Sequence, residues 1–473
     1  MLNLKDIILA LTNTPIPTPD KKISSVVIDS RQSEPGSLFI ALPGERSDGH
    51  QYVKDAFDRG AVLALVHQDM AEDFNTVDLR HGYFDTEQKD FSLPLCLRVD
   101  DTLKSLQTLA AYWRERHPVR TIGITGSVGK TTTKELTAAL LAQKFEVLKN
   151  PGNRNNEIGL PLTVLELTEK HQYAVLEMGF YVPGEIRTLC EIAHPHVGVI
   201  TNIGTVHAER AGSQEVIAQG KAELVQSLPP DPEGVAVLNM DDPLVKKMAD
   251  KTSAKVFSYG INQNADLMAT NITSQGLNGV AMTLVYRGKE YPVHSPLLGV
   301  FSAYTILRAS AVALIEGLDW ETIQAGIEKE QIDLRMRQFS LPNGITIIDD
   351  TYNASPASTI AALELLDKLE GRKIAILGDM LELGQYEKFG HQQVGARAAS
   401  IADVLILVGP RSKETAKSAL DKGFPEQLVH WHPNAKDAVN AVIKTLQEGD
   451  VVLIKGSNSM RMDQIISALE EKA

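Results

Sequence analysis

The segment Thr125–Thr132, with the sequence TGSVGKTT, restricts what this chain can fold into more than any other stretch. It follows the run Val119–Ile124, which predicts a buried parallel strand, and it precedes Thr133–Lys144, which predicts a helix. A glycine turn between a strand and a helix lets backbone N–H groups close around an anion, and the helix N-terminus adds positive potential. The segment therefore predicts a phosphate-binding loop.

The side chains of this loop fit the same interpretation. Lys130 is placed to reach the terminal phosphates of a nucleotide, and the Thr131 hydroxyl is placed to hold a magnesium ion. The common pattern has a glycine five positions before Gly129, where this chain has Ile124, so the loop is a variant. An ordinary glycine turn before a helix is the alternative. The candidate nucleotide ligands are Gly126, Ser127, Gly129, Lys130, Thr131 and Thr132.

Length and charge exclude several classes of function. A chain of 473 residues corresponds to about three domains. The net charge of −13 argues against a nucleic-acid-binding surface, so phosphates must meet local clusters. Cys96 and Cys190 are too few for a disulfide framework or a thiolate zinc site. Residues 1–10 lack a signal-peptide pattern, and no apolar run approaches the roughly 18 residues of a membrane span. We therefore expect a cytoplasmic protein without a membrane partner.

Strand and helix patterns predict an α/β protein of three domains. Residues 1–118 form a small α/β domain, and Pro118 marks its end. Residues 119–330 follow with a mostly parallel sheet, then short antiparallel strands over 266–294 and a helix at Ala303–Glu316. Residues 331–473 form a doubly wound, Rossmann-like domain. The predicted strands are Val26–Asp29, Leu38–Leu42, Ala61–His67, Tyr173–Glu177, Val197–Asn202, Val235–Asn239, Ile345–Asp349, Lys373–Leu377, Val404–Val408 and Val451–Ile454.

Polar residues near the ends of the central strands are candidates for metal binding. Glu177 ends a predicted strand, where its carboxylate can reach a magnesium ion on a nucleotide. His207 follows the next strand and is by itself a weak metal candidate. Lys221 lies on a helical stretch, where a lysine is normally a solvated charge. A solvated strand-end charge is likewise the alternative for Glu177.

Four further segments are candidates for ligand contacts. The loop Gly152–Pro161 carries Asn153, Asn155 and Asn156 as a dense set of donors suited to a substrate. Arg335 can cover a γ-phosphate, with a linker arginine as the alternative. In the segment DDTYNASP that starts at residue 349, Asp350, Tyr352 and Asn353 are candidate nucleotide contacts, with an Asx turn as the alternative. Two segments that follow strands are candidate substrate loops or capped turns: Gly378–Gly384 and Lys455–Ser459.

Together, and in this order, these motifs resemble the Mur ligases, the ATP-dependent amide-forming enzymes of peptidoglycan synthesis. The similarity covers essentially the whole chain. Asp349–Pro356 and Gly378–Gly384 are most similar to the MurF branch, and the Asp-Asn-Pro-Arg motif of the MurE branch does not occur in the sequence. In the first domain the similarity rests on Asp29-Ser30-Arg31, Pro35–Phe39, Gly44-Glu45 and Asp48-Gly49-His50.

The resemblance implies roles for single residues. Lys130 binds phosphates, Thr131 and Glu177 serve one magnesium ion, and His207 serves a second. Lys221 falls where the family carries a carbamylated lysine, an anionic magnesium ligand, and Arg335 matches the arginine of the γ-phosphate.

Other implied contacts concern the ribose and the substrates. Asp350 matches the ribose carboxylate, Ser30 and Arg31 fall where the family holds UDP, and the 152–161 loop faces the muramoyl peptide. One stretch departs from the family. Where most relatives carry His-Asn-x-x-Asn, this chain has Phe301, Ser302 and Thr305. The hydroxyls of Ser302 and Thr305 replace the two amides on the adenine side.

The implied reaction is the ATP- and Mg²⁺-dependent addition of D-alanyl-D-alanine to a UDP-N-acetylmuramoyl tripeptide through an acyl phosphate, by a monomer. Two alternatives stay open. One is another amide ligase of the superfamily, either MurE-like or a folylpolyglutamate synthetase. The other is a nucleotide-binding regulator without turnover, which only the altered 301–305 segment supports.

Overall fold

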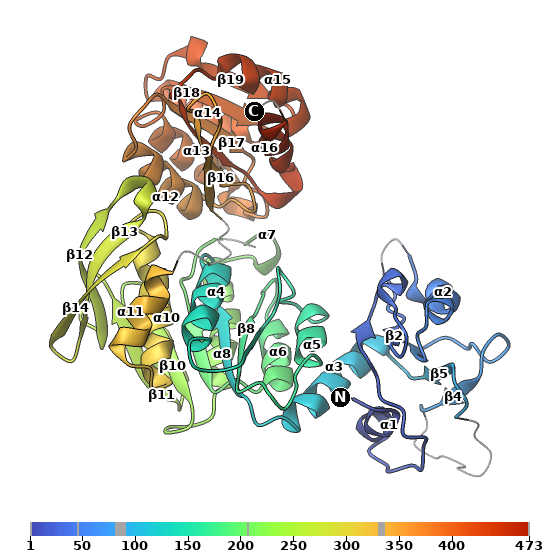
Figure 1. Cartoon of the computed structure of the whole chain (residues 1–473). Helices are drawn as coiled ribbons and strands as arrows, with labels where there is room; N and C mark the ends of the chain where they lie inside the picture. The colour runs from blue at the N-terminus through green and yellow to red at the C-terminus, as the bar shows by residue number, and fades with distance from the viewer. Residues whose placement is uncertain (1, 45–46, 81–90, 206–207, 330–335, 472–473) are drawn as a thin grey trace. The chain divides into compact units, whose positions relative to one another are not determined.

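The computed structural model describes residues 2–44, 47–80, 91–205, 208–329 and 336–471 (Figure 1). The chain divides into two compact units. The first comprises Met1–Gly123, Phe145–Gly179 and Glu185–His196, and the second comprises Ile124–Lys144, Phe180–Gly184 and Val197–Ala473. None of the helices within these described ranges is both long enough and apolar enough to cross a membrane.

The N-terminal sheet has five strands in the order β1-β2-β3-β5-β4, and the described pairs are parallel. Its central strand β3 is buried on both faces, which explains its unbroken apolar sequence LALV. The prediction missed β4 and β5, which are only three and four residues long. The strands are β1 (Val26–Val27), β2 (Leu38–Ile40), β3 (Leu63–Val66), β4 (Thr76–Asp78) and β5 (Leu95–Arg98), and the helices are α1 (Leu4–Thr12) and α2 (Val53–Asp58).

Helix α3 (Thr102–Glu115) leads out of this sheet and buries Leu106, Leu109 and Trp113 on one face. Asp101 caps its N-terminus by accepting from the Lys104 N–H. Near its C-terminus Arg114 is buried, and its guanidinium donates to the hydroxyl of Thr121 and to the carbonyls of Ala193, His117 and Val119 at 2.7–3.0 Å. Because four acceptors satisfy this cation, the polypeptide around Pro118 is held firmly at the expected boundary.

A second sheet has nine strands in the order β14-β13-β12-β11-β10-β9-β6-β8-β7. The β9–β12 pairs are parallel, whereas β12, β13 and β14 pair antiparallel, as predicted for 266–294. The strands are β6 (Arg120–Thr125), β7 (Val147–Lys149), β8 (Tyr173–Glu177), β9 (Val197–Ile200), β10 (Val235–Asn239), β11 (Lys255–Gly260), β12 (Leu267–Ser274), β13 (Val280–Tyr286) and β14 (Lys289–Ser295).

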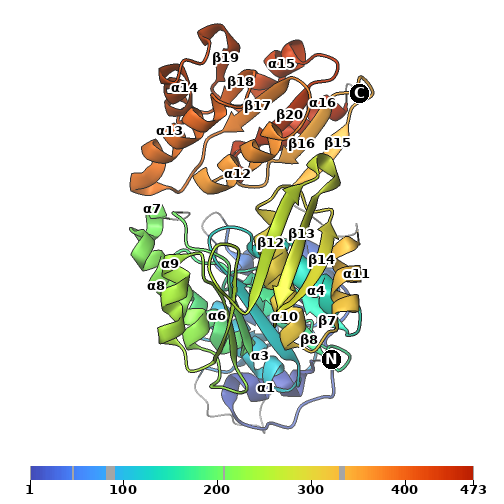
Figure 2. The same ribbon diagram turned by 90° about the vertical axis from the view of Figure 1, so that its left-hand side faces the viewer.

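Helices α4 and α10 pack against each other within the second unit (Figures 1 and 2). Helix α10 is buried nearly all round, which matches its apolar sequence. The helices of this region are α4 (Lys130–Leu141), α5 (Gly159–Val164), α6 (Glu185–Ala193), α7 (Ala208–Ala211), α8 (Gln214–Gln226), α9 (Pro243–Lys246), α10 (Ser302–Ile315) and α11 (Trp320–Glu328).

The C-terminal sheet has six strands in the order β15-β16-β20-β17-β18-β19, parallel except for β15. Helices cover both faces, as the two apolar cores on either side of the sheet require (Figure 2). The four predicted strands are confirmed, whereas the edge strands β15 and β19 were missed because they are largely solvent-accessible and lack a continuous apolar run. The elements are β15 (Arg337–Ser340), β16 (Thr346–Asp350), β17 (Lys373–Gly378), β18 (Val404–Val408), β19 (Val429–His432), β20 (Val451–Lys455), α12 (Pro356–Asp367), α13 (Glu387–Ala398), α14 (Ser412–Asp421), α15 (Ala435–Thr445) and α16 (Asp463–Glu470).

His196 makes the stability of the first unit depend on pH. Its Nδ1 accepts from the Thr121 N–H at 3.2 Å, so the folded state requires a neutral ring. Burial, with Arg120 and Arg114 nearby, lowers the pKa of His196 from 6.5 to about 4. Below about pH 6.5 the unfolded chain takes up a proton here that the folded chain does not, so the free energy of unfolding falls as the pH drops toward 4.

We expect the unfolding midpoint to fall by several degrees between pH 7 and pH 4.5, and to fall less in His196→Gln, whose amide oxygen can accept the same bond. Thermal denaturation followed by circular dichroism measures both. His294→Gln on β14 is the control, and it should keep the wild-type pH dependence. Equal pH dependence in His196→Gln and wild type would rule out this role.

Candidate functional site

The loop between β6 and α4 has the geometry of an anion cradle. Gly126 and Gly129 have φ angles of 144° and 83°, and Gly129 stands at the N-cap of α4. Asn202, just after β9, holds the loop by accepting from Ser127 N–H through its carbonyl at 2.9 Å and from Val128 N–H through its side chain at 3.0 Å. Because Asn202 holds the loop in place, the N–H groups at the N-terminus of α4 are available to an anion bound at the loop.

Gly126 is required by a close approach as well as by its φ angle. A Cβ at this position would collide with the side chain of Thr201 and would come within 3.0 Å of its backbone nitrogen. The Thr201 hydroxyl is buried, and none of the described residues forms a hydrogen bond with it. The sequence pattern predicted a glycine turn, but only the fold shows which neighbour makes this glycine necessary.

Lys130 and Thr131 begin α4 directly behind the cradle. The Lys130 ammonium donates to the carbonyls of Gly126 at 2.9 Å and Ser127 at 3.4 Å, so the side chain lies back along the loop. Thr131 is 8% exposed. This is the arrangement that the sequence predicts for a lysine and a hydroxyl next to phosphates.

A cavity of about 340 Å³ in the second unit joins this loop to two other predicted segments. Its lining includes Ser127 and Gly129–Thr132 of the loop, and it includes Asp350, Tyr352 and Asn353. Helix α10 contributes Phe301, Ser302, Tyr304, Thr305 and Arg308. The structure thus brings the described candidate nucleotide contacts together in one lining, except for Gly126, which is not part of it.

Asp350 is paired with a lysine that the sequence placed only in a general loop. The Lys455 ammonium, 2% exposed, lies 2.5 Å from the Asp350 carboxylate and donates to the Asn353 carbonyl at 2.8 Å. The Asx-turn alternative also occurs, but one residue earlier, because Asp349 accepts from Thr351 N–H at 3.1 Å. Lys455 therefore orients Asp350 at the wall of the cavity, since the two side chains come from neighbouring strands β20 and β16.

The hydroxyls of the altered 301–305 segment are engaged by residues nearby in the sequence. Ser302 donates to the Leu298 carbonyl at 2.6 Å, and Thr305 accepts from Arg308 at 3.0 Å. Tyr304 donates to Asp241 at 3.0 Å, and burial together with this carboxylate raises the pKa of Tyr304. Arg308, which sequence reasoning passed over, is the cationic side chain that α10 presents at the cavity.

Lys221 on α8 is buried, so the expectation of a solvated lysine was wrong. It is 1% exposed, its ammonium donates to the Gly126 carbonyl at 3.0 Å, and it lies 4.8 Å from the centre of the Phe180 ring. The helix turns this position inward, where the ammonium meets the loop carbonyl. Helical periodicity does not distinguish this lysine because the surrounding residues are small and mixed in polarity.

The first unit carries Glu177 and the asparagine-rich loop. Glu177 is 1% exposed, and its carboxylate accepts from the Asn155 side chain at 2.8 Å. The Asn156 side chain accepts from the Gly159 N–H at 2.9 Å just before α5, and the Asn153 carbonyl accepts from the Asn155 N–H. Asn155 thus points at the predicted metal ligand, and Asn156 has a local structural task.

The remaining predicted residues divide into described and undescribed ones. Ser30 is buried in a short 3₁₀ turn, and Arg31 is exposed, where it pairs with Asp29 at 2.6 Å and lowers the pKa of that carboxyl. His207 and Arg335 lie outside the described residues. Within the described ranges, no three His, Cys, Asp or Glu side chains are grouped as a metal centre.

The two candidate substrate loops of the C-terminal sheet are tied to each other. Ser457 accepts from Leu381 N–H at 2.9 Å, and its own N–H donates to the Asp379 carbonyl at 3.1 Å. The Asp379 carboxylate accepts from Ser412 N–H at 2.7 Å at the start of α14, and burial raises its pKa. Asp379 therefore has the structural role of the capped-turn alternative, because its carboxylate caps the start of α14.

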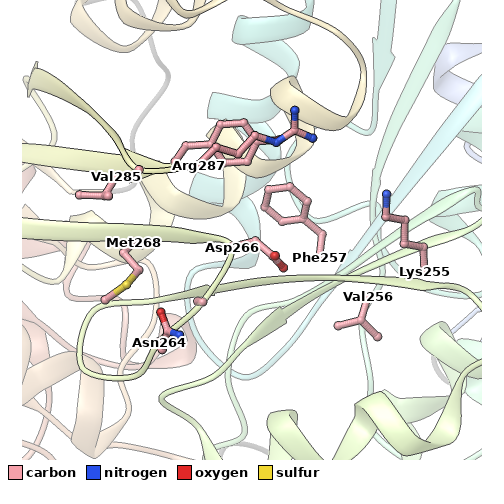
Figure 3. A pocket seen from close by; sticks show the side chains of 11 residues that line it. Lys255, Val256, Phe257, Asn264, Asp266, Met268, Val285 and Arg287 are labelled. Atoms are coloured by element: carbon pink, nitrogen blue, oxygen red, sulfur yellow. The ribbon is translucent and has the colours of Figure 1, made fainter.

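A second cavity, of about 400 Å³, lies at strands β11, β12 and β13 (Figure 3). Its lining includes Lys255, Phe257, Asp266 and Arg287, and it contains none of the residues singled out from the sequence. Asp266 is held by the Ser258 N–H and hydroxyl at 2.8 and 2.6 Å. The candidate functional site is therefore the cavity at the glycine loop.

Comparison with known proteins settles the family. Three family models match: "Mur ligase family, catalytic domain" over residues 22–79, "Mur ligase middle domain" over 124–313 and "Mur ligase, glutamate ligase domain" over 334–458. A UDP-N-acetylmuramoyl-tripeptide–D-alanyl-D-alanine ligase of Synechocystis is 36% identical, over 98% of this chain and 95% of that protein. The chain belongs to the Mur ligase family.

Other Mur ligases support the same assignment. The Bacillus subtilis protein with the same name is 36% identical over 95% of this chain and 93% of its own length. A crystal structure of MurF from Acinetobacter baumannii has a TM-score of 0.86 at 29% identity, over 99% and 98% of the two chains. MurF from Thermotoga maritima in complex with ADP has a TM-score of 0.79 at 25% identity, over 96% and 100%. The fold class predicted from the sequence is therefore confirmed.

The close approach of Thr201 to Gly126 generates a prediction for stability. We expect Gly126→Ala to lower the free energy of unfolding by about 3 kcal/mol, because a Cβ adds both a collision and an unfavourable φ angle. Gly317→Ala is the matched control, with a φ of 79° and no atom within 4 Å of the added Cβ, and it should cost about 1 kcal/mol. Chemical denaturation measures both, and equal losses would contradict the proposed collision.

Proposed function

We propose that this Mur ligase joins D-alanyl-D-alanine to the terminal carboxylate of a UDP-N-acetylmuramoyl tripeptide, with release of ADP and phosphate, in cytoplasmic peptidoglycan precursor synthesis. The observation that carries the proposal is the full-length similarity, at 33–36% identity, to ligases named for this reaction. The cavity at the glycine loop supports it, because a loop of this kind suits the ATP that such a reaction needs.

The proposal assigns one task to each of three domains. Residues 1–118 bind the UDP part of the substrate, 119–330 bind ATP, and 331–473 complete the nucleotide site and receive the amine. Each family match falls inside one of these ranges, which supports the division. The enzyme acts as a monomer on small molecules, without a nucleic acid or membrane partner.

ATP would lie with its phosphates at the start of α4. Backbone N–H groups at Gly129 and Thr132 meet the phosphate oxygens, Gly126 and Ser127 shape the loop around them, and Lys130 exchanges its carbonyl partners for the phosphates. On the opposite wall Asp350, oriented by Lys455, accepts from the ribose hydroxyls, and Tyr352 and Asn353 border the base. Arg335 is proposed as the γ-phosphate contact.

The donor types fit a magnesium ion. Thr131 offers a hydroxyl at the cavity, and Glu177 offers a buried carboxylate, both of which are oxygen ligands that Mg²⁺ prefers. Bound magnesium neutralises charge on the phosphate oxygens. Lys221 fits only as a carbamate, because an ammonium has no lone pair for a metal, and its burial beside Gly126 places it next to the loop. His207 is proposed for a second ion.

The chemistry is the activation of a poor electrophile. The substrate carboxylate attacks the γ-phosphorus of ATP and forms an acyl phosphate while ADP leaves. The amine of D-alanyl-D-alanine then attacks the acyl carbon, and the tetrahedral intermediate expels phosphate. Lys130 and the N-terminus of α4 stabilise the negative charge that moves among oxygens in both steps.

Substrate contacts complete the proposal. Ser30 and Arg31 hold the UDP moiety, and the loop with Asn153, Asn155 and Asn156 faces the muramoyl peptide. Glu177 holds the side chain of Asn155, which supports a link between this loop and the metal. Amide ligases of other specificity, such as the folylpolyglutamate synthase of Mycobacterium tuberculosis at 18% identity, share the fold alone.

Phosphate release tests the reaction. We expect release from ATP to require both a UDP-N-acetylmuramoyl tripeptide and D-alanyl-D-alanine, with the ligated pentapeptide identified by mass spectrometry. A panel that crosses tripeptides ending in meso-diaminopimelate or lysine with D-alanyl-D-alanine and single amino acids defines both specificities. Release that ignores D-alanyl-D-alanine would refute the assignment, and ATP binding without any release would favour a regulator.

Lys130 provides a second test. We expect Lys130→Met to lower kcat/KM for ATP by roughly 10²–10³-fold, because it removes a cation from the phosphates while the fold keeps its other contacts. Lys289→Met, on the exposed end of β14, is the control for loss of a lysine and should retain wild-type activity. Activity of Lys130→Met within threefold of wild type would show that phosphates do not bind at this loop.

A further inference from the structure

Arg308 is a buried cation whose hydrogen-bond partners, among the described residues, are neutral hydroxyls. It is 3% exposed, on the face of α10 that also presents Phe301, Tyr304 and Thr305 to the cavity. Its Nε donates to the Thr133 hydroxyl at 2.9 Å, and its Nη2 donates to the Thr305 hydroxyl at 3.0 Å. Both partners are neutral, and within the described part of the chain no carboxylate forms an ion pair with this guanidinium.

An uncompensated buried charge is costly, and the rest of the molecule shows how such charges are normally satisfied. Arg114, equally buried, donates to four acceptors. Lys455 has the carboxylate of Asp350. Among the described residues Arg308 has only hydroxyl partners, those of Thr133, Thr305 and Tyr259. A charge in this state is expected to meet an anion that comes from solution.

The position of Arg308 indicates where that anion binds. Helices α4 and α10 pack side by side (Figure 1), and a Cβ placed on Gly129 would lie 2.9 Å from Nη2 of Arg308. The guanidinium therefore lies beside the N-terminus of α4, next to Lys130, where the helix already carries positive potential. In the lining, Lys455 is paired with Asp350, so Lys130, Arg308 and the N-terminus of α4 leave an excess of positive charge that an anionic ligand would offset.

We propose that the Arg308 guanidinium binds the α- or β-phosphate of the nucleotide, with Thr133 and Thr305 holding the guanidinium in place. The proposal rests on ATP as the substrate of this cavity. It also explains two features of the loop and the helix. Gly129 leaves room for the guanidinium, and Arg308 supplies a donor on α10 where the hydroxyls of Ser302 and Thr305 are already engaged.

The test compares nucleotide affinity with stability of the free protein. Loss of a charge-assisted hydrogen bond predicts that Arg308→Gln binds Mg-ADP roughly 10–100-fold more weakly by calorimetry, with Arg308→Lys in between. The KM for the UDP-linked substrate should stay within twofold. Because the variant removes an unpaired buried charge, the unfolding midpoint of the nucleotide-free protein should stay the same or rise. Comparing AMP with ADP identifies the phosphate. If Arg308 contacts the α-phosphate, Arg308→Gln weakens the binding of both nucleotides. If it contacts the β-phosphate, only ADP binding is weakened.

Arg397→Gln is the control, since it removes a partly exposed arginine that pairs with Glu364 in the C-terminal sheet domain, and its ADP affinity should be that of wild type. If wild type fails to bind ADP, the proposed function falls and this inference with it. If wild type binds ADP and Arg308→Gln binds it within twofold, the inference alone is overturned. A drop in both affinity and stability is decided by Arg308→Lys: affinity at least threefold better than that of the glutamine variant supports a phosphate contact, and equal affinity assigns Arg308 a structural role.

Discussion

The contact between Gly126 and Thr201 is the constraint on which the candidate site depends. It joins the end of β6 to the end of β9 without space for a Cβ, and the neighbouring Asn202 then pairs with Ser127 and Val128. These bonds hold the loop so that the first N–H groups of α4 point into the cavity. The residues that α10 and the C-terminal sheet add to the cavity can contact the same ligand only if the loop keeps this position.

Buried charges distinguish the structural parts of the molecule from the parts available for chemistry. Arg114 is fully satisfied by protein acceptors, as a purely structural cation must be. Lys221 is buried against the Gly126 carbonyl of the glycine loop, and Lys455 is paired with Asp350 of the cavity wall. Arg308 is buried with neutral partners only. Arg308 is thus the buried cation with charge available for a ligand at the glycine loop.

Much of the fold followed from local patterns, and the misses have physical reasons. Strands buried on both faces, such as β18, show as continuous apolar runs and were placed correctly. Edge strands β15 and β19 were missed, because an exposed strand needs no such run. In the site, the loop was predicted because its glycines, lysine and hydroxyl occupy consecutive positions. Lys221 was misjudged because its burial depends on which way α8 faces.

By itself the sequence determined the phosphate loop, the α/β class and the family, because these depend on residues close together in the chain or on a motif order. Only the tertiary structure decided that Lys455 pairs with Asp350, that the hydroxyls of Ser302 and Thr305 are engaged by Leu298 and Arg308, and that Arg308 lies beside Gly129. Lys455 and Asp350, and likewise Arg308 and Gly129, are far apart in the sequence. Which face of α10 is buried depends on how the helix packs. Burial and charge compensation are properties of the assembled neighbours, which no local pattern encodes.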